Sequence, residues 1–161
     1  MGIKLGFTGT RTHMTHNQMF NLAIILEDYK NKFLISSIEE FHNGCCEGSD
    51  NISNYIIKAI SPLTKIHWHP PIDKKYVKKC YVKPDIVYED KPYLERNKCI
   101  VDKTEHLIAI PKGFNEEVRS GTWATIRYAR LKKKPIIIIF PDGKIKKENF
   151  NRGLEKWQKK K

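Results

Sequence analysis

The chain has 161 residues and a formal net charge of +12, and 40% of its residues are hydrophobic and 30% charged. This length and composition are those of a globular chain with enough residues for one domain around a buried core. The sequence shows neither a long uncharged apolar run nor a signal-peptide pattern, so we expect a cytoplasmic protein with no membrane partner.

The N-terminal region predicts a strand, a turn and a helix. Residues 3–7 (IKLGF) are short and apolar and are followed by a T-G-T-R turn at residues 8–11. Thr15 and Gln18 have the spacing of a capping box, and apolar residues at helical spacing come directly after them. The glycine in the turn and the basic residue after it are typical of a phosphate-binding turn.

A second unit of the same kind follows. Residues 38–42 (IEEFH) predict a strand, and residues 43–50 form a turn that contains two glycines. Apolar residues at positions 52, 55, 56, 59 and 60 then lie on one face of a helix. We expect Asp50 or Ser49 to cap this helix and Pro62 to end it.

Residues 65–69 (KIHWH) predict a third strand, which stops at two prolines. Residues 70–90 show no convincing period, and a segment of this length favours a functional or mobile cover, although Val82, Ile86 and Val87 could equally form a short strand. His67 and His69 alternate on one face of the third strand and could ligate a metal. Because no third ligand lies at a useful spacing, we expect these histidines to pack or hydrogen-bond, and we expect no metal and no cofactor.

The next helix is predicted from Pro92, in its first turn, to about Asp102. Asn97 falls in the middle of the apolar stripe of this helix, and Arg96 falls at its edge. A buried amide needs a partner, which for Asn97 is either neighbouring backbone or a ligand. Both alternatives remain open from the sequence.

Two continuous apolar runs frame the last predicted helix. Residues 105–111 (EHLIAIP) and 135–140 (PIIIIF) predict buried strands, and Ser120-Gly121-Thr122 opens the helix between them. A buried strand that leads into such a turn is a phosphate-site geometry, although the same residues also form an ordinary helix cap.

The alternation of strands and helices predicts an α/β fold, with an open parallel sheet of about five strands, helices on both faces, and residues 3–7 near the centre. All three glycine turns fall at carboxyl ends of strands, where sheets of this kind bind ligands. We expect one domain at residues 1–143 and a basic tail at 144–161.

Four motifs carry a resemblance to the SLOG superfamily of Rossmann-like proteins, especially its small stand-alone YspA-like members. They are the G-F-T-G-T-R run at residues 6–11, the H-N-G and G-S-D runs in residues 42–50, Arg96-Asn97, and the S-G-T turn with the helix that follows it. Relatives in this superfamily include the LOG phosphoribohydrolases and DNA-processing protein A. The resemblance implies a Rossmann-like domain that binds a phosphorylated nucleotide or nucleotide-derived small molecule, and it implies a homo-oligomer.

Carried over residue by residue, the resemblance implies that Thr10 and Arg11 meet a phosphate and that Gly121 and Thr122 hold phosphate oxygens. The expected ligand-binding residues are Gly9, Thr10, Arg11, Gly44, Gly48, Asp50, Arg96, Asn97, Ser120, Gly121 and Thr122.

The sequence departs from LOG-type enzymes at the position of a glutamate. Those enzymes carry a P-G-G-x-G-T-x-x-E motif, and Thr125 stands here where the glutamate would be. Glu47 is the candidate catalytic carboxylate, and Glu116 or Glu117 could swing in. Hydrolysis of an N-glycosidic bond needs such a carboxylate near the ribose.

Three functions follow from these observations. The first is a sensor or sequestering domain for an ADP-ribose-like molecule, a nucleotide sugar or a cyclic nucleotide. The alternative is a nucleoside or nucleotide N-glycosidase, like a phosphoribohydrolase, or a transferase. The second alternative is nucleic-acid binding through the basic tail and a lysine cluster, Lys74, Lys75, Lys78, Lys79 and Lys83.

Overall fold

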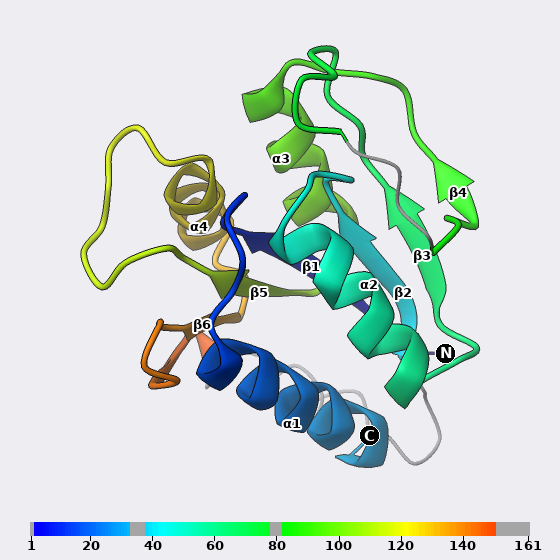
Figure 1. The fold of residues 1–161 in the computed structure, drawn as a ribbon, viewed down its shortest axis with the longest axis vertical. Helices are drawn as coiled ribbons and strands as arrows, with labels where there is room; N and C mark the ends of the chain where they lie inside the picture. The colour runs from blue at the N-terminus through cyan, green and yellow to red at the C-terminus, as the bar shows by residue number, and fades with distance from the viewer. Residues whose placement is uncertain (1, 33–37, 78–81, 151–161) are drawn as a thin grey trace.

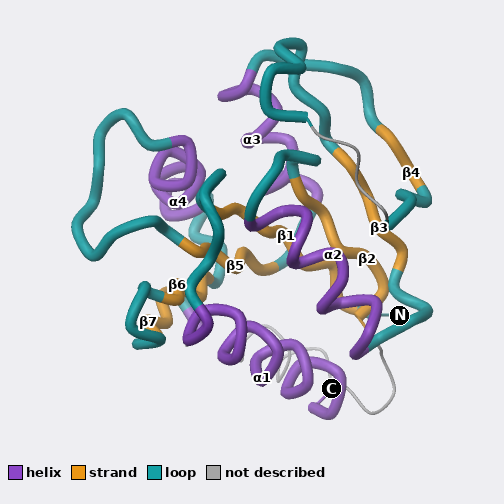
Figure 2. The backbone as a smooth tube through the Cα atoms, in the orientation of Figure 1, coloured by secondary structure: helices purple, strands orange, loops and turns teal. Residues whose placement is uncertain are grey.

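The computed structural model describes residues 2–32, 38–77 and 82–150. Eleven helices and strands alternate along these residues (Figures 1 and 2). In chain order they are β1 (Ile3–Gly9), α1 (His16–Lys32), β2 (Ile38–Asn43), α2 (Ser49–Ile60), β3 (Lys65–Trp68), β4 (Ile86–Val87), α3 (Tyr93–Lys103), β5 (His106–Ile110), α4 (Gly121–Leu131), β6 (Ile136–Ile139) and β7 (Ile145–Glu148).

The strands form one seven-stranded sheet in the order β4-β3-β2-β1-β5-β6-β7. Every neighbouring pair is parallel except β6 and β7, which are antiparallel. All five predicted strands are present and β1 lies at the centre, so the α/β prediction is confirmed. The chain runs outward from β1 to one edge, then returns through α3 to the other side of β1, and the strand order therefore reverses beside β1.

Helices cover both faces of the sheet, as predicted. On one face Leu22 and Leu26 of α1 and Ile57 of α2 pack with Leu5 and Phe7 of β1. Figure 1 shows α1 and α2 side by side on the near face. On the other face the buried residues of α3 and α4 pack with alternate residues of β5 and β6, namely Val101, Trp123, Ile126, Ala129, Leu107, Ala109, Ile136 and Ile138.

The ends of two helices match the capping signals in the sequence. Thr15 N–H donates to Gln18 Oε1 at 3.0 Å, and Gln18 N–H donates to Thr15 Oγ1 at 3.1 Å, which is the reciprocal pair of a capping box. Ser120 Oγ accepts from the Trp123 amide at 3.3 Å and caps α4. The prediction for α2 is wrong, because Gly48 occupies the N-cap position and no side chain caps this helix.

The sheet extends beyond the prediction at both edges. Ile86 and Val87 do form a strand, β4, and Ile145–Glu148 forms β7, which lies past the expected domain boundary at residue 143. The remainder of the expected basic tail, residues 151–161, lies outside the described residues. Within the described part of the chain, no helix has the length and apolar character that crossing a membrane requires.

Candidate functional site

The turns that follow β1 and β2 meet at the carboxyl edge of the sheet. The Ser49 amide, at the start of α2, donates to the Thr10 carbonyl at 3.1 Å, and the Thr10 amide donates to the Ile110 carbonyl at 2.9 Å. Gly48 has φ +82°, and a Cβ at this position would lie 2.2 Å from the Arg11 carbonyl oxygen. Glycine is therefore required at residue 48 by its backbone conformation and by the close approach of the first turn.

Asp50 organises the second turn from the inside. Its Oδ2 accepts hydrogen bonds from the Gly44 and Cys46 amides, both at 3.1 Å, and the side chain is buried. Burial raises the pKa of Asp50 to about 6, although the nearby Arg96 charge and the two amides oppose this rise. Asp50 holds the turn rather than the helix end, which corrects its predicted role as a cap.

Arg96 reaches from α3 into the same turn. Its guanidinium donates to the carbonyl oxygens of Gly44 and, at 3.1 Å, of His69, and it lies 3.7 Å from Cys46 Sγ. A Cβ on Gly44 would lie 1.8 Å from Arg96 Nη1, so only glycine leaves room for this side chain. Arg96 is 5% exposed, and its Nε has no hydrogen-bond partner among the described residues. A buried cationic N–H in this state is suited to an additional acceptor.

Arg11 is exposed and stacks between two tyrosines. Its guanidinium carbon lies 4.1 Å from the ring centre of Tyr76 and 4.7 Å from that of Tyr93. The Glu47 amide donates to the Tyr76 carbonyl at 2.8 Å, so the segment between β3 and β4 contacts both of the first two turns. That residues 70–90 form a functional or mobile cover remains a prediction.

The third predicted turn lies against α3. Asn97 Nδ2 donates to the Gly121 carbonyl across a long 3.5 Å separation, and Thr125 Oγ1 donates to the same carbonyl at 2.8 Å. Asn97 thus has a backbone partner on α4, while Thr122 is buried and Gly121 is exposed.

Two cavities of about 200 Å³ lie next to these residues. The first is lined by His69, Tyr88, Glu89, Lys91, Arg96, Cys99 and Lys103. The second, between α3 and α4, is lined by Leu94, Asn97, Lys98, Ala124, Thr125, Arg127 and Tyr128. Arg96 and Asn97 therefore border different cavities, and neither cavity is lined by Arg11, Asp50, Gly121 or Thr122.

The acidic residues that the sequence put forward have other contacts. Glu116 forms ion pairs with Arg127 at 3.2 Å and Arg130 at 2.9 Å, and these hydrogen bonds lower its pKa. Glu47 is half-buried at the second turn. Thr125 occupies the position of the family glutamate and hydrogen-bonds within its own helix.

Polar side chains of β2 and β3 form a row that the sequence predicted only in part, since it singled out His67 and His69 but neither Glu40 nor their contact with His42. Glu40 Oε2 lies 2.7 Å from His42 Nε2, and His42 Nδ1 lies 2.9 Å from His69 Nε2, which leads to the first cavity. Burial lowers the pKa of His42 to about 4 and that of His69 to about 3, so both rings are neutral at neutral pH. Burial alone would raise the pKa of Glu40, but hydrogen bonds from His42 and Lys4 outweigh it and lower that pKa.

The sequence does contain a signal for this row. Glu40 and His42 alternate on one strand, and His67 and His69 alternate on the next, so each strand places polar side chains on one face. Polar positions two apart on adjacent parallel strands predict a shared polar patch. The lysines of the first cavity, Lys91 and Lys103, carry no comparable pattern.

Comparisons with solved structures agree with this fold. The chain is similar to the molybdenum cofactor binding protein of the phototrophic bacterium Rippkaea orientalis, with a TM-score of 0.61 and 16% sequence identity, over 86% of this chain and 76% of that one. It is also similar to the structural-genomics protein TM1055, with a TM-score of 0.55 and 13% identity, over 84% and 72% of the two chains. At such identities the likeness is one of fold, a Rossmann-like open α/β sheet. Neither a protein-family model nor a curated protein matches the chain.

Proposed function

We propose that this protein is a SLOG-type domain of the YspA-like kind, which binds a phosphorylated, nucleotide-derived small molecule as a sensor or sequestering protein. The observation that carries the proposal is the meeting of two arginines from separate segments with the glycine turns at the carboxyl edge of the sheet. Arg11 contacts Tyr93 of α3, and Arg96 of α3 contacts Gly44 of the second turn.

The charges around the first cavity favour an anionic ligand. Lys91, Arg96 and Lys103 line it together with a single carboxylate, Glu89. The free Nε of Arg96 could donate a charge-assisted hydrogen bond to a phosphate oxygen. The cavity volume of about 200 Å³ is below the range of about 300–1,000 Å³ for drug-sized ligands, which suits part of a nucleotide, such as its phosphate and sugar.

Arg11 is placed to change partners when a phosphate arrives. A cation–π contact at an exposed site contributes about 0.5–1 kcal/mol, whereas a hydrogen bond to a charged group contributes about 1.5–3 kcal/mol. A phosphate within reach would therefore draw the Arg11 guanidinium from between Tyr76 and Tyr93. The two rings would then be free to stack on a base or sugar.

The observations favour binding over hydrolysis. An N-glycosidase needs a carboxylate beside the ribose, and Glu116 is held by two arginines while Thr125 replaces the family glutamate. Two lysines of the cluster are likewise engaged, since Lys74 pairs with Asp90 at 2.6 Å and Lys75 lies over Tyr76. The homo-oligomer implied by the family resemblance remains a proposal, which light scattering on the eluting protein would test.

Calorimetry on three variants tests the proposal. The ligands are AMP, ADP-ribose, a nucleotide sugar, a cyclic nucleotide and the molybdenum cofactor that the Rippkaea orientalis protein binds. Arg11→Ala should weaken the best ligand by about 1.5–3 kcal/mol, and Lys103→Ala should weaken it measurably. Lys65→Ala is the control, because it removes the same charge at the opposite end of β3. Equal affinity of Arg11→Ala and wild type for every phosphorylated ligand that binds would show that the site lies elsewhere.

A further inference from the structure

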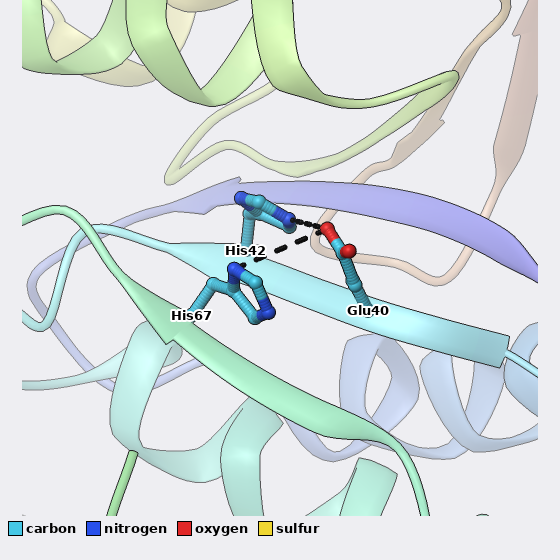
Figure 3. Close-up of side chains that lie close together, drawn as sticks. All are labelled: Glu40, His42 and His67. Atoms are coloured by element: carbon cyan, nitrogen blue, oxygen red, sulfur yellow. Dashed lines mark hydrogen bonds and ion pairs between the residues drawn. The ribbon is translucent and has the colours of Figure 1, made fainter. Parts of the chain in front are cut away.

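A second candidate site lies on β2 and β3, directly before the second glycine turn. Glu40 and His42 are two residues apart on β2 and therefore point to the same face of the sheet. His67 is the parallel-register partner of His42 on β3, which brings its ring onto that face as well. Figure 3 shows the three side chains turned toward one another above the two strands. One carboxylate and two imidazoles are thus gathered by the strand register alone.

The donor atoms have nearly the separations of a metal site. One ligand atom from each residue lies within 4.8 Å of the other two. Glu40 Oε2 lies 2.7 Å from His42 Nε2 and 3.9 Å from His67 Nδ1. Bonds of about 2.0–2.1 Å to a tetrahedral zinc ion separate the ligand atoms by about 3.3 Å. The two distances from Glu40 Oε2 lie on either side of this value, so a rotation of the carboxylate would bring both closer to it.

The surroundings support these side chains in the manner of a metal site. His69 Nε2 lies 2.9 Å from the other nitrogen of His42, and Lys4 Nζ lies 2.9 Å from the other oxygen of Glu40. Partners of this kind orient metal ligands by holding the atom that does not coordinate. The Tyr88 hydroxyl lies 3.0 Å from His67 Nδ1, the nitrogen that faces Glu40, so an ion bound there would replace this hydrogen bond.

Hydrogen bonding within the chain does not fully account for this cluster. His42 and His67 are buried, with side-chain exposures of 1% and 4%, and Glu40 has 15%. The His67 Nε2 atom is buried and has no hydrogen-bond partner among the described residues. Buried polar atoms are nearly always satisfied. The unpartnered nitrogen of His67 is Nε2 and the one that faces Glu40 is Nδ1, so the hydrogen bonds of the described residues do not satisfy both nitrogens of this ring.

We propose that Glu40, His42 and His67 bind one divalent transition-metal ion of the zinc type. Two imidazoles favour such an ion over magnesium or calcium, which prefer oxygen ligands only. Three protein ligands leave a further coordination position, as zinc sites with exchangeable ligands do. The ion would link β2 to β3 next to the residues His69 and Tyr88 that line the first cavity. This site is independent of the phosphate site proposed above, and either can fail without the other.

Cobalt(II) binding to tag-free protein treated with a chelator tests the assignment. The wild type should take up one equivalent of Co²⁺, with the visible absorption of a tetrahedral ion, and Zn²⁺ should displace it. Glu40→Gln and His67→Gln should each weaken Co²⁺ binding by at least about tenfold, since changes even to groups behind the ligands have effects of this size. His106→Gln is the matched control, because His106 is a half-buried histidine outside the cluster, and its Nδ1 lies 2.7 Å from the Tyr29 hydroxyl. Its Co²⁺ spectrum should equal that of the wild type.

A second measurement needs only the wild type and covers the case in which a variant does not fold. X-ray absorption at the zinc edge should show nitrogen and oxygen at about 2.0–2.1 Å, with the outer scattering of two imidazoles. A sulfur shell at about 2.3 Å would assign the ion to cysteine and overturn the proposal. Uptake well below one equivalent by the folded wild type, or unchanged uptake by folded Glu40→Gln and His67→Gln, would overturn it as well.

Discussion

Asp50 is a buried carboxylate that supports the second turn at the carboxyl edge of the sheet. It holds the Gly44 and Cys46 amides, and Cys45 between them has φ 57°, a conformation that non-glycine residues seldom adopt. The two hydrogen bonds stabilise this turn. The turn places the Gly44 carbonyl oxygen where it accepts a hydrogen bond from Arg96. The strain at residue 45 and the burial of the charge are both tolerated at this position, which is typical of functional turns.

The raised pKa of Asp50 predicts a specific pH dependence of stability. The folded-state pKa of about 6 lies above the ordinary 3.8. The contribution of Asp50 is therefore most favourable below about pH 3.8, and it is lost as the pH rises through about 6. Asp50→Asn keeps the shape of the side chain and an acceptor oxygen. Because the amide does not ionise, the variant does not lose stability as the pH rises through this range. Relative to wild type, the variant should gain about 2 kcal/mol of unfolding free energy between about pH 4.5 and about pH 7.

Urea unfolding of both proteins at the two pH values measures this difference, and taking the difference cancels the contributions of the histidines. A gap between the two proteins that does not change with pH would mean that Asp50 has an ordinary pKa in the folded protein.

Substitution of two glycines in the candidate site is expected to have different effects, on stability for Gly48 and on ligand binding for Gly121. Gly48→Ala would place a Cβ 2.2 Å from the Arg11 carbonyl in a backbone of φ +82°, whereas the nearest atom to a Cβ on Gly121 is 3.8 Å away. Gly48→Ala should therefore lower the unfolding free energy by more than about 2 kcal/mol. Gly121→Val should leave thermal melting nearly unchanged and weaken ligand binding, because its side chain projects at the helix end.

Thermal melting and calorimetry of the two variants separate a structural from a binding effect. The interpretation of the Ser-Gly-Thr turn as a phosphate turn would be untenable if Gly121→Val bound the ligand as tightly as the wild type.

At the level of elements, α1 is fixed at its N-terminus by more than its capping box. Gln18 Nε2 also donates to the carbonyl oxygens of Pro111 at 2.9 Å and Ile139 at 3.0 Å, and the side chain is fully enclosed. Gln18 therefore connects the start of α1 to the ends of β5 and β6. A residue that the sequence marks as a local helix signal is here also a long-range tie between three elements.

Because Gln18 has both roles, replacing it should lower the unfolding free energy by more than replacing its capping-box partner Thr15. Thr15→Ala should lower the unfolding free energy by about 1 kcal/mol, the usual effect of losing a cap. Gln18→Ala should lower it by at least about 2 kcal/mol, because it also leaves two buried carbonyl groups without their donor. Asn17→Ala, an exposed neighbour on the same turn, should change it by less than about 0.5 kcal/mol. Equal costs for Thr15→Ala and Gln18→Ala in chemical denaturation would show that the ties to β5 and β6 contribute nothing.

The contacts of the edge strand β7 and of Phe150 predict how many C-terminal residues can be deleted without loss of stability. Arg130 on α4 donates to both carboxylate oxygens of Glu148 at 2.8 and 2.9 Å, and Phe150 packs against the main core and the His106 ring. Deleting residues 151–161 should therefore leave melting and ligand binding nearly unchanged. Deleting residues 144–161 should lower the melting temperature by at least about 5 °C, because it also removes β7 and uncovers β6.

Scanning calorimetry of the two shortened chains makes the comparison. A drop of several degrees for the shorter deletion would contradict the prediction, and would show that Leu154 or Trp157 contributes to the core.

At the scale of the whole molecule, the sequence predicted what depends on local periodicity. All five apolar strands, the four helices and the central position of β1 follow from runs of Ile, Leu and Phe between glycine turns. The strand β7 was not predicted, because the sequence IKKE has one apolar residue and forms a strand only by pairing with β6. The contacts of buried polar residues could not be predicted, because they depend on the folded structure. Asp50 reads as a helix cap in sequence, and only the folded turn shows the two amides that it accepts from.

The candidate site was predictable in its parts and not in its assembly. The sequence located the turns, since a parallel sheet brings its strand ends to one edge. It did not show that Arg96 and Asn97 border separate cavities, nor that two tyrosines hold Arg11, because these contacts join segments far apart in the chain.

The place of β1 at the centre of the sheet also has a consequence for how the protein is made. β1 pairs on one side with β2, which soon follows it, and on the other side with β5, where Leu5–Gly9 face His106–Ile110. A ribosome adding about 5–20 residues per second needs roughly 5–20 s to extend the chain from the first of these strands to the second. Over that interval the nascent chain carries its central strand with one side unpaired. An unpaired strand edge is open to wrong pairing and aggregation, and in this chain the pairing of β1 with β5 removes that exposure only after residue 110 has been made.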